Sequence, residues 1–193
     1  MPGTSLQLEY LDGVQVLRLS SEDGTNRLTR ACVLSLEETI RGLAKDKQAL
    51  VITGNDKFFS AGADLQEIAA LDGATAYEFS KMGQSLMASI TNFPAPVTAA
   101  IAGYCMGGGL DLALACRYRV AAPQSIFGHR GAALGLITGW GGTQRLPRIV
   151  GKARALEMFV AAEKLDAERA LRMGLVDAIA TDPVKEAMRR LRA

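Results

Sequence analysis

The glycine-rich centre of the chain reads Ala99-Ala-Ile-Ala-Gly-Tyr-Cys-Met-Gly-Gly-Gly-Leu-Asp-Leu-Ala-Leu-Ala-Cys116. An apolar run typical of a buried β-strand leads through glycines into a helix, and Asp111 is the only carboxylate of the segment. Glycines let a ligand approach the backbone closely, and the free N–H groups at a helix start favour negative charge. This junction is therefore predicted to stabilise an oxyanion.

A second junction of the same kind lies upstream. Residues 49–53 (Ala-Leu-Val-Ile-Thr) predict a short buried strand, and residues 54–65 lead from it through small residues into a helical turn. An oxyanion hole needs donors from two directions, about 3 Å from the developing charge, and each donor is typically worth about 2.7–4 kcal/mol of transition-state stabilisation. The two junctions together can supply such donors.

Three separated motifs occur in order along the chain. They are Phe58-Phe-Ser-Ala-Gly-Ala-Asp-Leu65, Ala102-Gly-Tyr-Cys-Met-Gly-Gly-Gly-Leu-Asp111 and Gly141-Gly-Thr-Gln-Arg-Leu-Pro-Arg-Ile-Val-Gly-Lys-Ala-Arg-Ala-Leu-Glu-Met158. With them the chain closely resembles the enoyl-CoA hydratase/isomerase (crotonase) family, from about residue 6 to residue 179. The resemblance implies an α/β fold, the family's β-β-α superhelix, which periodicity alone does not choose. We expect one crotonase-like domain over residues 1–193, with a core at about 5–180 and a shortened C-terminal helical region at 181–193.

Composition indicates a globular protein. A chain of 193 residues with 49% hydrophobic and 22% charged residues can form one domain with a sizeable core. The net charge of +2 gives no reason to expect a nucleic acid or a membrane as partner. Cys32, Cys105 and Cys116 lack metal-ligand spacing, so we expect buried free thiols and no metal. Because no signal peptide or long transmembrane run is evident, we expect a cytoplasmic location.

Strands and helices are predicted to alternate. A hairpin of residues 6–10 and 14–19 turns at Asp12-Gly13, and an amphipathic helix follows Thr29, a candidate N-cap, to about residue 44. A short apolar segment, Leu175-Val176, precedes the last helix. The remaining expected helices are at 75–91, 110–116, around Arg145, at 154–161, at 167–173 and from 183, and the remaining strands are at 97–101, 119–121 and 125–128.

The resemblance also implies how a coenzyme A thioester is bound. Coenzyme A is then part of the substrate, and no permanently bound cofactor is expected. Ala63 and Gly108 match the positions whose backbone N–H groups form the family's oxyanion hole. Asp64 is also a candidate helix N-cap, Arg27 also suits a solvated surface charge, and Trp140 can either narrow the acyl pocket or pack in the core. The candidate substrate-binding residues are Arg27, Ala61, Gly62, Asp64, Leu65, Gly107, Gly131, Gly139 and Trp140.

The acid–base residues depart from the family's pattern. Hydratases of the family present two glutamates to one water, so that one removes its proton while the other protonates the substrate's α-carbon. Asp111 occupies the first position with a shorter side chain, and a misplacement of about 1 Å can lower the rate about 100-fold. Gly131 occupies the second position, and Gly139 stands where dienoyl-CoA isomerases carry an acid. Asp111 as a single base therefore suits isomerisation better than hydration, unless it only caps the helix.

His129 is the only histidine and lies two residues before Gly131. It is a candidate replacement for the missing proton donor, because imidazole exchanges protons near neutral pH, although a surface or packing side chain is the preferred interpretation. We favour an isomerase- or hydratase-type enzyme on unsaturated acyl-CoA thioesters, with Asp111 as base. The alternative is a catalytically impaired protein that binds CoA esters or acts as a scaffold.

The sequence also bears on macromolecular partners. The resemblance implies a homotrimer or a hexamer, and no membrane partner is expected. Nucleic-acid binding is a weaker hypothesis, which rests on basic residues whose spacing suits one helical face. Nearby glutamates and the absence of interleaved aromatic residues favour a solvated face instead. The basic residues are Arg145, Arg148, Lys152 and Arg154, and the glutamates are Glu157 and Glu163.

Overall fold

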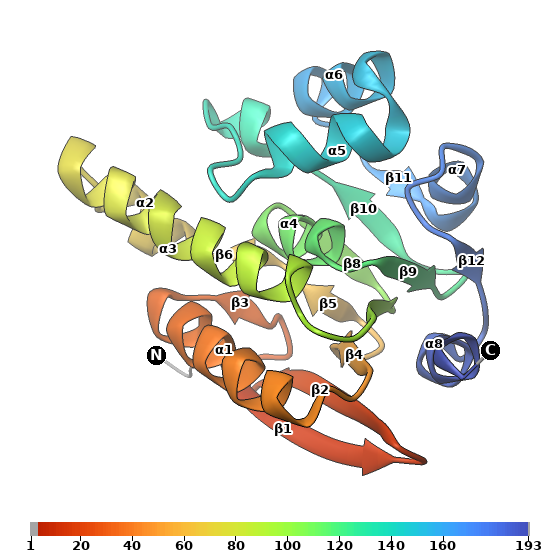
Figure 1. The fold of residues 1–193 in the computed structure, drawn as a ribbon. Helices are drawn as coiled ribbons and strands as arrows, with labels where there is room; N and C mark the ends of the chain where they lie inside the picture. The colour runs from red at the N-terminus through yellow and green to blue at the C-terminus, as the bar shows by residue number, and fades with distance from the viewer. Residues whose placement is uncertain (1–3, 193) are drawn as a thin grey trace.

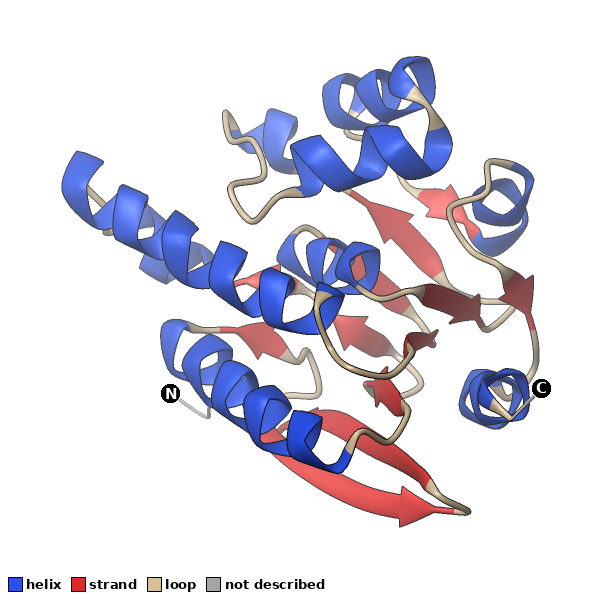
Figure 2. Cartoon of the chain, viewed as in Figure 1, coloured by secondary structure: helices blue, strands red, loops and turns tan. Residues whose placement is uncertain are grey.

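Repeated β-β-α units build the fold in the computed structural model, which describes residues 4–192 (Figure 1). The first strand of each unit joins a six-stranded sheet, the second joins a smaller sheet, and a helix follows. This repetition is the one that the family resemblance implies. Figure 2 shows the helices gathered around the strands of these sheets.

The six-stranded sheet has the order β1-β2-β4-β7-β9-β12. β1 and β2 are antiparallel, and all the other neighbours in this sheet are parallel. Two smaller sheets have the orders β11-β10-β8-β5 and β3-β6. The strands are β1 (Thr4–Leu11), β2 (Val14–Ser21), β3 (Arg27–Leu28), β4 (Leu50–Thr53), β5 (Phe58–Ser60), β6 (Gly62–Ala63), β7 (Val97–Ile101), β8 (Tyr104–Met106), β9 (Tyr118–Ala121), β10 (Ile126–Gly128), β11 (Leu165–Asp166) and β12 (Ala178–Ile179).

Helices cover both faces of the six-stranded sheet. α1 and α3 lie side by side (Figure 1). α8 packs against β4, β7 and β9. The helices are α1 (Arg30–Leu43), α2 (Leu65–Ala69), α3 (Gly73–Thr91), α4 (Gly108–Ala115), α5 (Gly142–Val150), α6 (Lys152–Ala161), α7 (Ala167–Arg172) and α8 (Pro183–Leu191), with short 3₁₀ helices η1 (Ala44–Asp46) and η2 (Gly131–Leu134).

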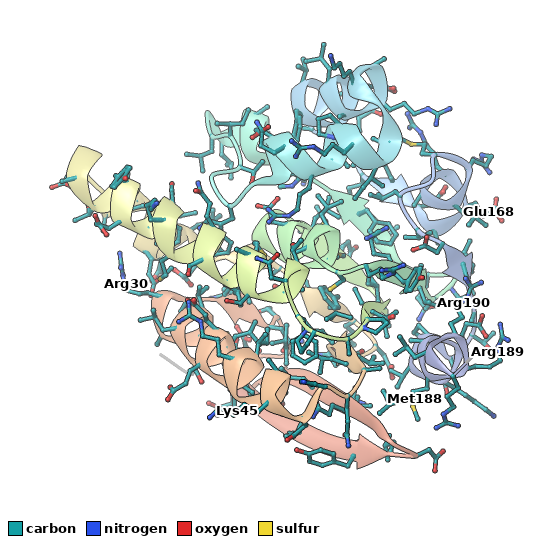
Figure 3. All side chains as sticks on the ribbon, in the orientation of Figure 1. Arg30, Lys45, Glu168, Met188, Arg189 and Arg190 are labelled. Carbon is teal, nitrogen blue, oxygen red and sulfur yellow. The ribbon has the colours of Figure 1, made fainter. Side chains whose placement is uncertain are left out.

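Side-chain alternation along the strands divides the core into two layers. Leu17 and Leu19 of β2 belong to the main core, which contains residues of α1, α3 and α4, whereas Val14 and Val16 face the layer covered by α8. Charged side chains such as Arg30, Lys45 and Glu168 lie on the outside (Figure 3). None of the helices in residues 4–192 has the length and apolar character that a membrane span requires.

The structure confirms the elements with strong periodicity and shows others that were not expected. Thr29 is the N-cap of α1, and the hairpin turns at Asp12-Gly13 as predicted. β5, β6 and β8 were missed, because strands of two or three residues show no periodicity. The late segment at residues 175–176 is buried, but the strand β12 follows it rather than coinciding with it.

Gly103 allows the chain to turn from β7 into β8 and so to reach the glycine-rich centre. Its φ is +61°, and a Cβ atom there would lie 2.0 Å from the backbone oxygen of Lys57. We therefore expect Gly103→Ala to lower the free energy of unfolding by at least about 2 kcal/mol. Chemical denaturation measures this change. Gly42→Ala in α1 is the control, because a Cβ there meets nothing within 4 Å, and helix propensity predicts a gain of about 0.5–1 kcal/mol.

Candidate active site

Two backbone N–H groups lie close together where β6 approaches the start of α4. Gly62 has a φ of +94°, and a Cβ atom there would lie 2.6 Å from the Met106 oxygen and 3.0 Å from the Gly108 nitrogen. A Cβ atom at Gly108 would lie 3.2 Å from the Ala63 nitrogen. Gly108 is the first residue of α4, so its N–H has no acceptor inside the helix. This close backbone approach suits an oxyanion site formed by Ala63 and Gly108.

Asp111 lies in the first turn of α4, and its side chain is only 2% exposed. Its Oδ1 is 3.0 Å from His129 Nε2, and its Oδ2 accepts a hydrogen bond from the Thr138 hydroxyl. Both carboxylate oxygens therefore have partners. The structure presents a linked carboxylate and imidazole, rather than the isolated base that the sequence suggested.

His129 follows β10, and its side chain is 5% exposed, so the preferred expectation of a surface or packing residue is incomplete. Its ring packs against Phe159 of α6, with centroids 5.3 Å apart. An ionised Asp111 accepts the proton of Nε2–H, which leaves Nδ1 as the basic nitrogen. Within residues 4–192, Nδ1 has no hydrogen-bond partner, and it is not among the fully enclosed unpaired atoms. His129 itself lines the candidate cavity.

The N-terminus of α5 lies against the Asp111 carboxylate. A Cβ atom at Gly142, the first residue of α5, would lie 2.2 Å from Asp111 Oδ1 and 3.1 Å from His129 Nε2. The positive end of a helix dipole favours negative charge at this place. Burial lowers the pKa of the Arg145 guanidinium, and the charge of Asp111 opposes that shift. The start of α5 and the Arg145 guanidinium are therefore positive groups near the Asp111 carboxylate.

A methyl group at Gly142 tests how tightly this contact is packed. We expect Gly142→Ala to displace the Asp111 carboxylate from His129 and to lower the free energy of unfolding by about 1–3 kcal/mol. The imidazole NMR signals report the contact directly, because the chain has one histidine. Gly73→Ala at the start of α3 is the control, since a Cβ there meets nothing within 4 Å. Unchanged imidazole signals in Gly142→Ala would show that the contact is looser than described.

Backbone blocks a side chain at Gly131, whereas at Gly139 the obstacle is a serine hydroxyl that can rotate away. A Cβ atom at Gly131 would lie 2.6 Å from the Leu136 oxygen, and one at Gly139 would lie 2.8 Å from the Ser80 hydroxyl. The loop through η2 therefore supplies no carboxylate. In the part of the chain that the structure describes, the titratable side chains lining the cavity are Asp111, His129 and Arg130.

Trp140 forms part of the cavity wall and is also buried. Its Nε1 donates a hydrogen bond to the Phe79 oxygen at 3.2 Å, and the Trp140 and Phe79 rings lie 5.2 Å apart. Its indole contacts Gly83 of α3 and Gly108 of α4, where a Cβ atom would lie 2.1 Å and 2.5 Å from ring atoms. Core packing and shaping of the cavity are therefore both correct descriptions of Trp140.

Asp64 and Arg27 lie beside the cavity rather than in its wall. Asp64 is the N-cap of α2 and accepts from the backbone N–H groups of Gln66 and Glu67, which confirms that expectation. Arg27 is 46% exposed, with ion-pair distances of 3.1 Å to Asp23 and 3.7 Å to Asp64. A phosphate contact by Arg27 would have to compete with these carboxylates.

The cavity has a volume of about 700 Å³ and brings together most of the residues that the sequence singled out. Arg27, Gly62 and Asp64 are not among its lining residues. Sequence reasoning missed Thr138 and Phe79, because a threonine in a loop and an aromatic residue on a helix give no local signal of a site. The predicted residues that line it are Ala61, Ala63, Leu65, Gly107, Gly108, Asp111, His129, Gly131, Gly139 and Trp140.

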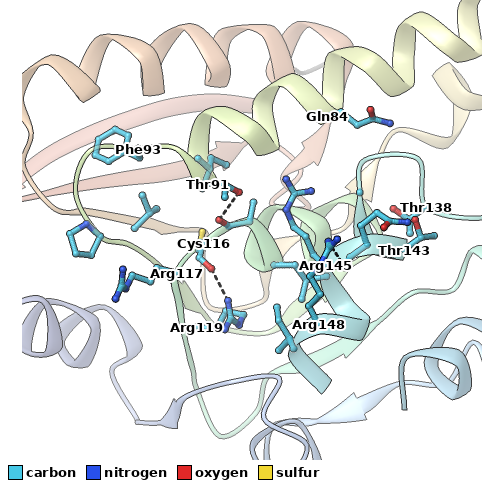
Figure 4. A pocket seen from close by; sticks show the side chains of 18 of the residues that line it. Gln84, Thr91, Phe93, Cys116, Arg117, Arg119, Thr138, Thr143, Arg145 and Arg148 are labelled. Atoms are coloured by element: carbon cyan, nitrogen blue, oxygen red, sulfur yellow. Dashed lines mark hydrogen bonds between the residues drawn. The ribbon is translucent and has the colours of Figure 1, made fainter. Parts of the chain in front are cut away.

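A larger hollow of about 1170 Å³ adjoins the first cavity at Ser80 and Thr138-Gly139 (Figure 4). Its lining contains four arginines and, among the described residues, no carboxylate. It includes neither Asp111 nor the Ala63 and Gly108 backbones, so it is not the candidate active site. The four arginines are Arg117, Arg119, Arg145 and Arg148.

The predicted single basic face is wrong. Gly151, with a φ of +85°, separates α5 from α6, so the basic residues of the two helices do not follow one helical face. Arg145 and Arg148 line the larger hollow, whereas the Arg154 guanidinium donates to the Met173 oxygen. The geometry removes the observation on which the nucleic-acid hypothesis rested.

Comparison with known proteins gives consistent matches along the chain. A model of the family described as enoyl-CoA hydratase/isomerase matches residues 9–193. Crotonyl-CoA hydratase of Syntrophomonas wolfei subsp. wolfei is 36% identical over 175 residues, which are 89% of this chain and 67% of that protein. A Bacillus subtilis protein named "Probable enoyl-CoA hydratase" is 45% identical over 136 residues, which are 70% of this chain and 53% of that protein. The match thus spans about half the length of the Bacillus subtilis relative.

Solved structures show the same fold. Pseudomonas aeruginosa DspI is 36% identical, with a TM-score of 0.91 over 97% of this chain and 73% of that chain. An enoyl-CoA hydratase from Bacillus anthracis is 31% identical, with a TM-score of 0.91 over 97% of this chain and 75% of that chain. The β-β-α arrangement described above is therefore the crotonase fold.

Proposed function

The chain belongs to the enoyl-CoA hydratase/isomerase family, and on that premise we propose that it transfers a proton within unsaturated acyl-CoA thioesters, shifting their double bond. The observation that carries the proposal is the 3.0 Å contact between His129 Nε2 and Asp111 Oδ1. These two side chains line the same cavity as Ala63 and Gly108. The cavity thus combines a proton-transfer pair with backbone donors for an oxyanion.

In this proposal the thioester carbonyl oxygen lies between the N–H groups of Ala63 and Gly108. Loss of a proton from the carbon next to the carbonyl, or from the carbon conjugated with it, places negative charge on that oxygen. Each backbone donor then stabilises the transition state by about 2.7–4 kcal/mol. The start of α4 adds the positive end of its dipole at Gly108.

His129 is the proposed carrier of the proton. Its Nδ1 removes a proton from one carbon, exchanges it with solvent and delivers a proton to the other end of the three-carbon system, so the double bond moves and no water is consumed. Asp111 holds the imidazole in the required tautomer and stabilises its positive charge, as the acid of a catalytic triad does. Thr138 and the start of α5 in turn hold Asp111.

Hydration by two carboxylates is the less supported reaction, although relatives of this chain are named as hydratases. The backbone at Gly131 leaves no room for an acid, and Asp111 already has a partner on each oxygen. One imidazole can serve both steps of an isomerisation, because removing a proton from one carbon leaves it protonated for delivery to the other, and its N–H proton exchanges with solvent between the two steps.

We also propose how the remainder of the substrate is held and how the protein is organised. The coenzyme A arm lies along residues 61–65, with Arg27 near its phosphates, and no other cofactor is needed. The chain is one domain that acts in the cytoplasm and assembles as a homotrimer or hexamer. Light scattering coupled to size-exclusion chromatography tests the assembly, and a monomer over the whole concentration range would contradict it.

Mass spectrometry of unsaturated acyl-CoA esters incubated with the purified protein in D₂O tests the reaction. We expect the recovered ester to gain deuterium and to have a shifted double bond, without the added mass of water. A product heavier by one water would replace isomerisation with hydration. Binding of the esters without any mass change would contradict an enzyme and favour a CoA-ester-binding protein, for which the glycines at 131 and 139 are the motivating observation.

A further inference from the structure

We infer that Trp140 closes the inner end of the acyl pocket and directs the acyl chain outward over an apolar rim, so that straight acyl chains of eight or more carbons are preferred. This inference rests on the proposed function, because it places the substrate's thioester at Ala63 and Gly108. To the proposed reaction it adds a preferred substrate class, acyl-CoA esters with long straight chains. Three features of the cavity carry it: the position of Trp140, the exposure of the rim, and the largely apolar lining.

The indole of Trp140 occupies the space next to the proposed oxyanion site. It lies between Gly83 of α3 and Gly108 of α4, and larger residues at either glycine would collide with the ring. The hydrogen bond from its Nε1 to the Phe79 oxygen fixes the ring in this position. An acyl group whose carbonyl lies at Gly108 therefore cannot extend between α3 and α4.

Exposed apolar side chains form another part of the cavity lining. We define the apolar rim as Leu65 of α2 together with Leu134, Leu136 and Ile137 in and after η2. These side chains are 55%, 57%, 38% and 71% exposed, respectively. Exposed apolar side chains gathered at one opening mark a binding surface rather than ordinary scatter. All four line the same cavity as Asp111 and His129.

Further apolar side chains line the same cavity. They include Ile68, Leu71, Ala76 and Phe79, and no carboxylate except Asp111 lies in the described lining. A volume of about 700 Å³ is in the range of cavities that hold whole drug-sized ligands, well above what a four-carbon acyl group needs. The largely apolar lining and the volume favour an extended hydrocarbon chain as the occupant of the rim.

A chain-length series tests the inference in two independent ways. The dissociation constants of saturated acyl-CoA esters with 4, 8 and 12 carbons report binding, and kcat/KM of the corresponding 3-enoyl esters reports turnover. We expect affinity and kcat/KM to rise at least about twofold per added methylene up to eight carbons, as partial burial of each methylene requires. A flat or falling series in both measurements would overturn the inference. Length-dependent binding without turnover would overturn the proposed reaction and leave the inference standing.

Variants separate the rim from an interface between copies. Ile137→Ser should lower the 12-carbon to 4-carbon ratio of affinities about tenfold or more. Leu156→Ser, which changes a comparably exposed apolar residue of α6 outside the cavity, should not. A change of oligomeric state in Ile137→Ser without a change in this ratio would show that the rim is an interface and would contradict the inference.

Substitution of Trp140 tests the closed inner end. Trp140→Ala should improve the relative affinity for α-branched or β-branched acyl esters over straight ones at least about tenfold, because it opens space between Gly83 and Gly108. Trp140→Phe, which keeps an aromatic ring, is the second variant should the alanine protein not fold, and it should shift the same ratio in the same direction by a smaller factor. An unchanged ratio in a folded variant would contradict the closed end.

Discussion

Asp111→Asn will lower the turnover of unsaturated acyl-CoA esters by about 10⁴-fold, because the orienting acid of an acid–imidazole pair has that effect when it becomes an amide. The amide keeps the shape of the carboxylate but loses its charge and presents a donor on one side. His129 Nε2 then loses the acceptor that fixes its tautomer. Steady-state kcat measures the loss, and the dissociation constant of a saturated ester should change less than about threefold, since the backbone donors remain.

The control for this variant is Asp56→Asn, which changes an exposed aspartate outside the candidate cavity. We expect it to leave kcat unchanged. Thr138→Val is a milder companion, because it removes one of the two hydrogen bonds to Asp111, and a loss of about 10-fold is expected. If Asp111→Asn is folded and keeps a tenth or more of the activity, the assigned role of Asp111 is wrong.

The second large effect is expected at His129. His129→Gln should lower kcat by about 10²–10⁴-fold, the usual contribution of one general acid–base group. Glutamine can still hydrogen bond to Asp111 but cannot carry a proton. A role in packing alone, through the contact with Phe159, would lower the free energy of unfolding and leave kcat unchanged in the folded fraction.

Chemical rescue distinguishes proton transfer from packing more sharply. His129→Ala leaves a space beside Asp111, so added imidazole should restore a measurable part of the lost rate in a saturable manner. The matched control is Phe159→Ala, which removes the packing partner of His129 and should not respond to imidazole. Failure of imidazole to restore any rate, together with an active His129→Gln, would exclude His129 as the proton carrier.

The parts of the fold that sequence predicts well are those whose signal is local. The amphipathic helix α1, with its Thr29 cap, and the Asp12-Gly13 hairpin depend on neighbouring residues, and both are present. β5, β6 and β8 are too short to show a period, and they form because parallel neighbours supply their hydrogen bonds. The break between helices α5 and α6 is equally hard to predict, because it depends on the backbone conformation of one residue, Gly151, inside an otherwise continuous helical pattern.

The candidate site likewise contains residues that the sequence indicates and contacts that only the fold creates. Ala63, Gly108 and Asp111 belong to contiguous motifs, so the sequence indicates them. The contact of His129 with Asp111 depends on the parallel pairing of β10 with β8, which places Gly128 opposite Met106 and so brings the end of β10 to the start of α4. Thr138 and Gly142 approach the carboxylate from a loop and from a second helix, α5, and no spacing along the chain predicts that contact.

The central claim is that Asp111 and His129 act as one unit, and a double-mutant cycle tests it most directly. The measured quantity is the initial rate of deuterium incorporation from D₂O into a 3-enoyl-CoA ester, for the unaltered protein, Asp111→Asn, His129→Gln and the double variant. Residues that act as a unit have strongly non-additive effects, so the double variant should be within about threefold of the slower single variant. A double variant whose loss equals the product of the two single losses would show that the two side chains act independently and would contradict the account.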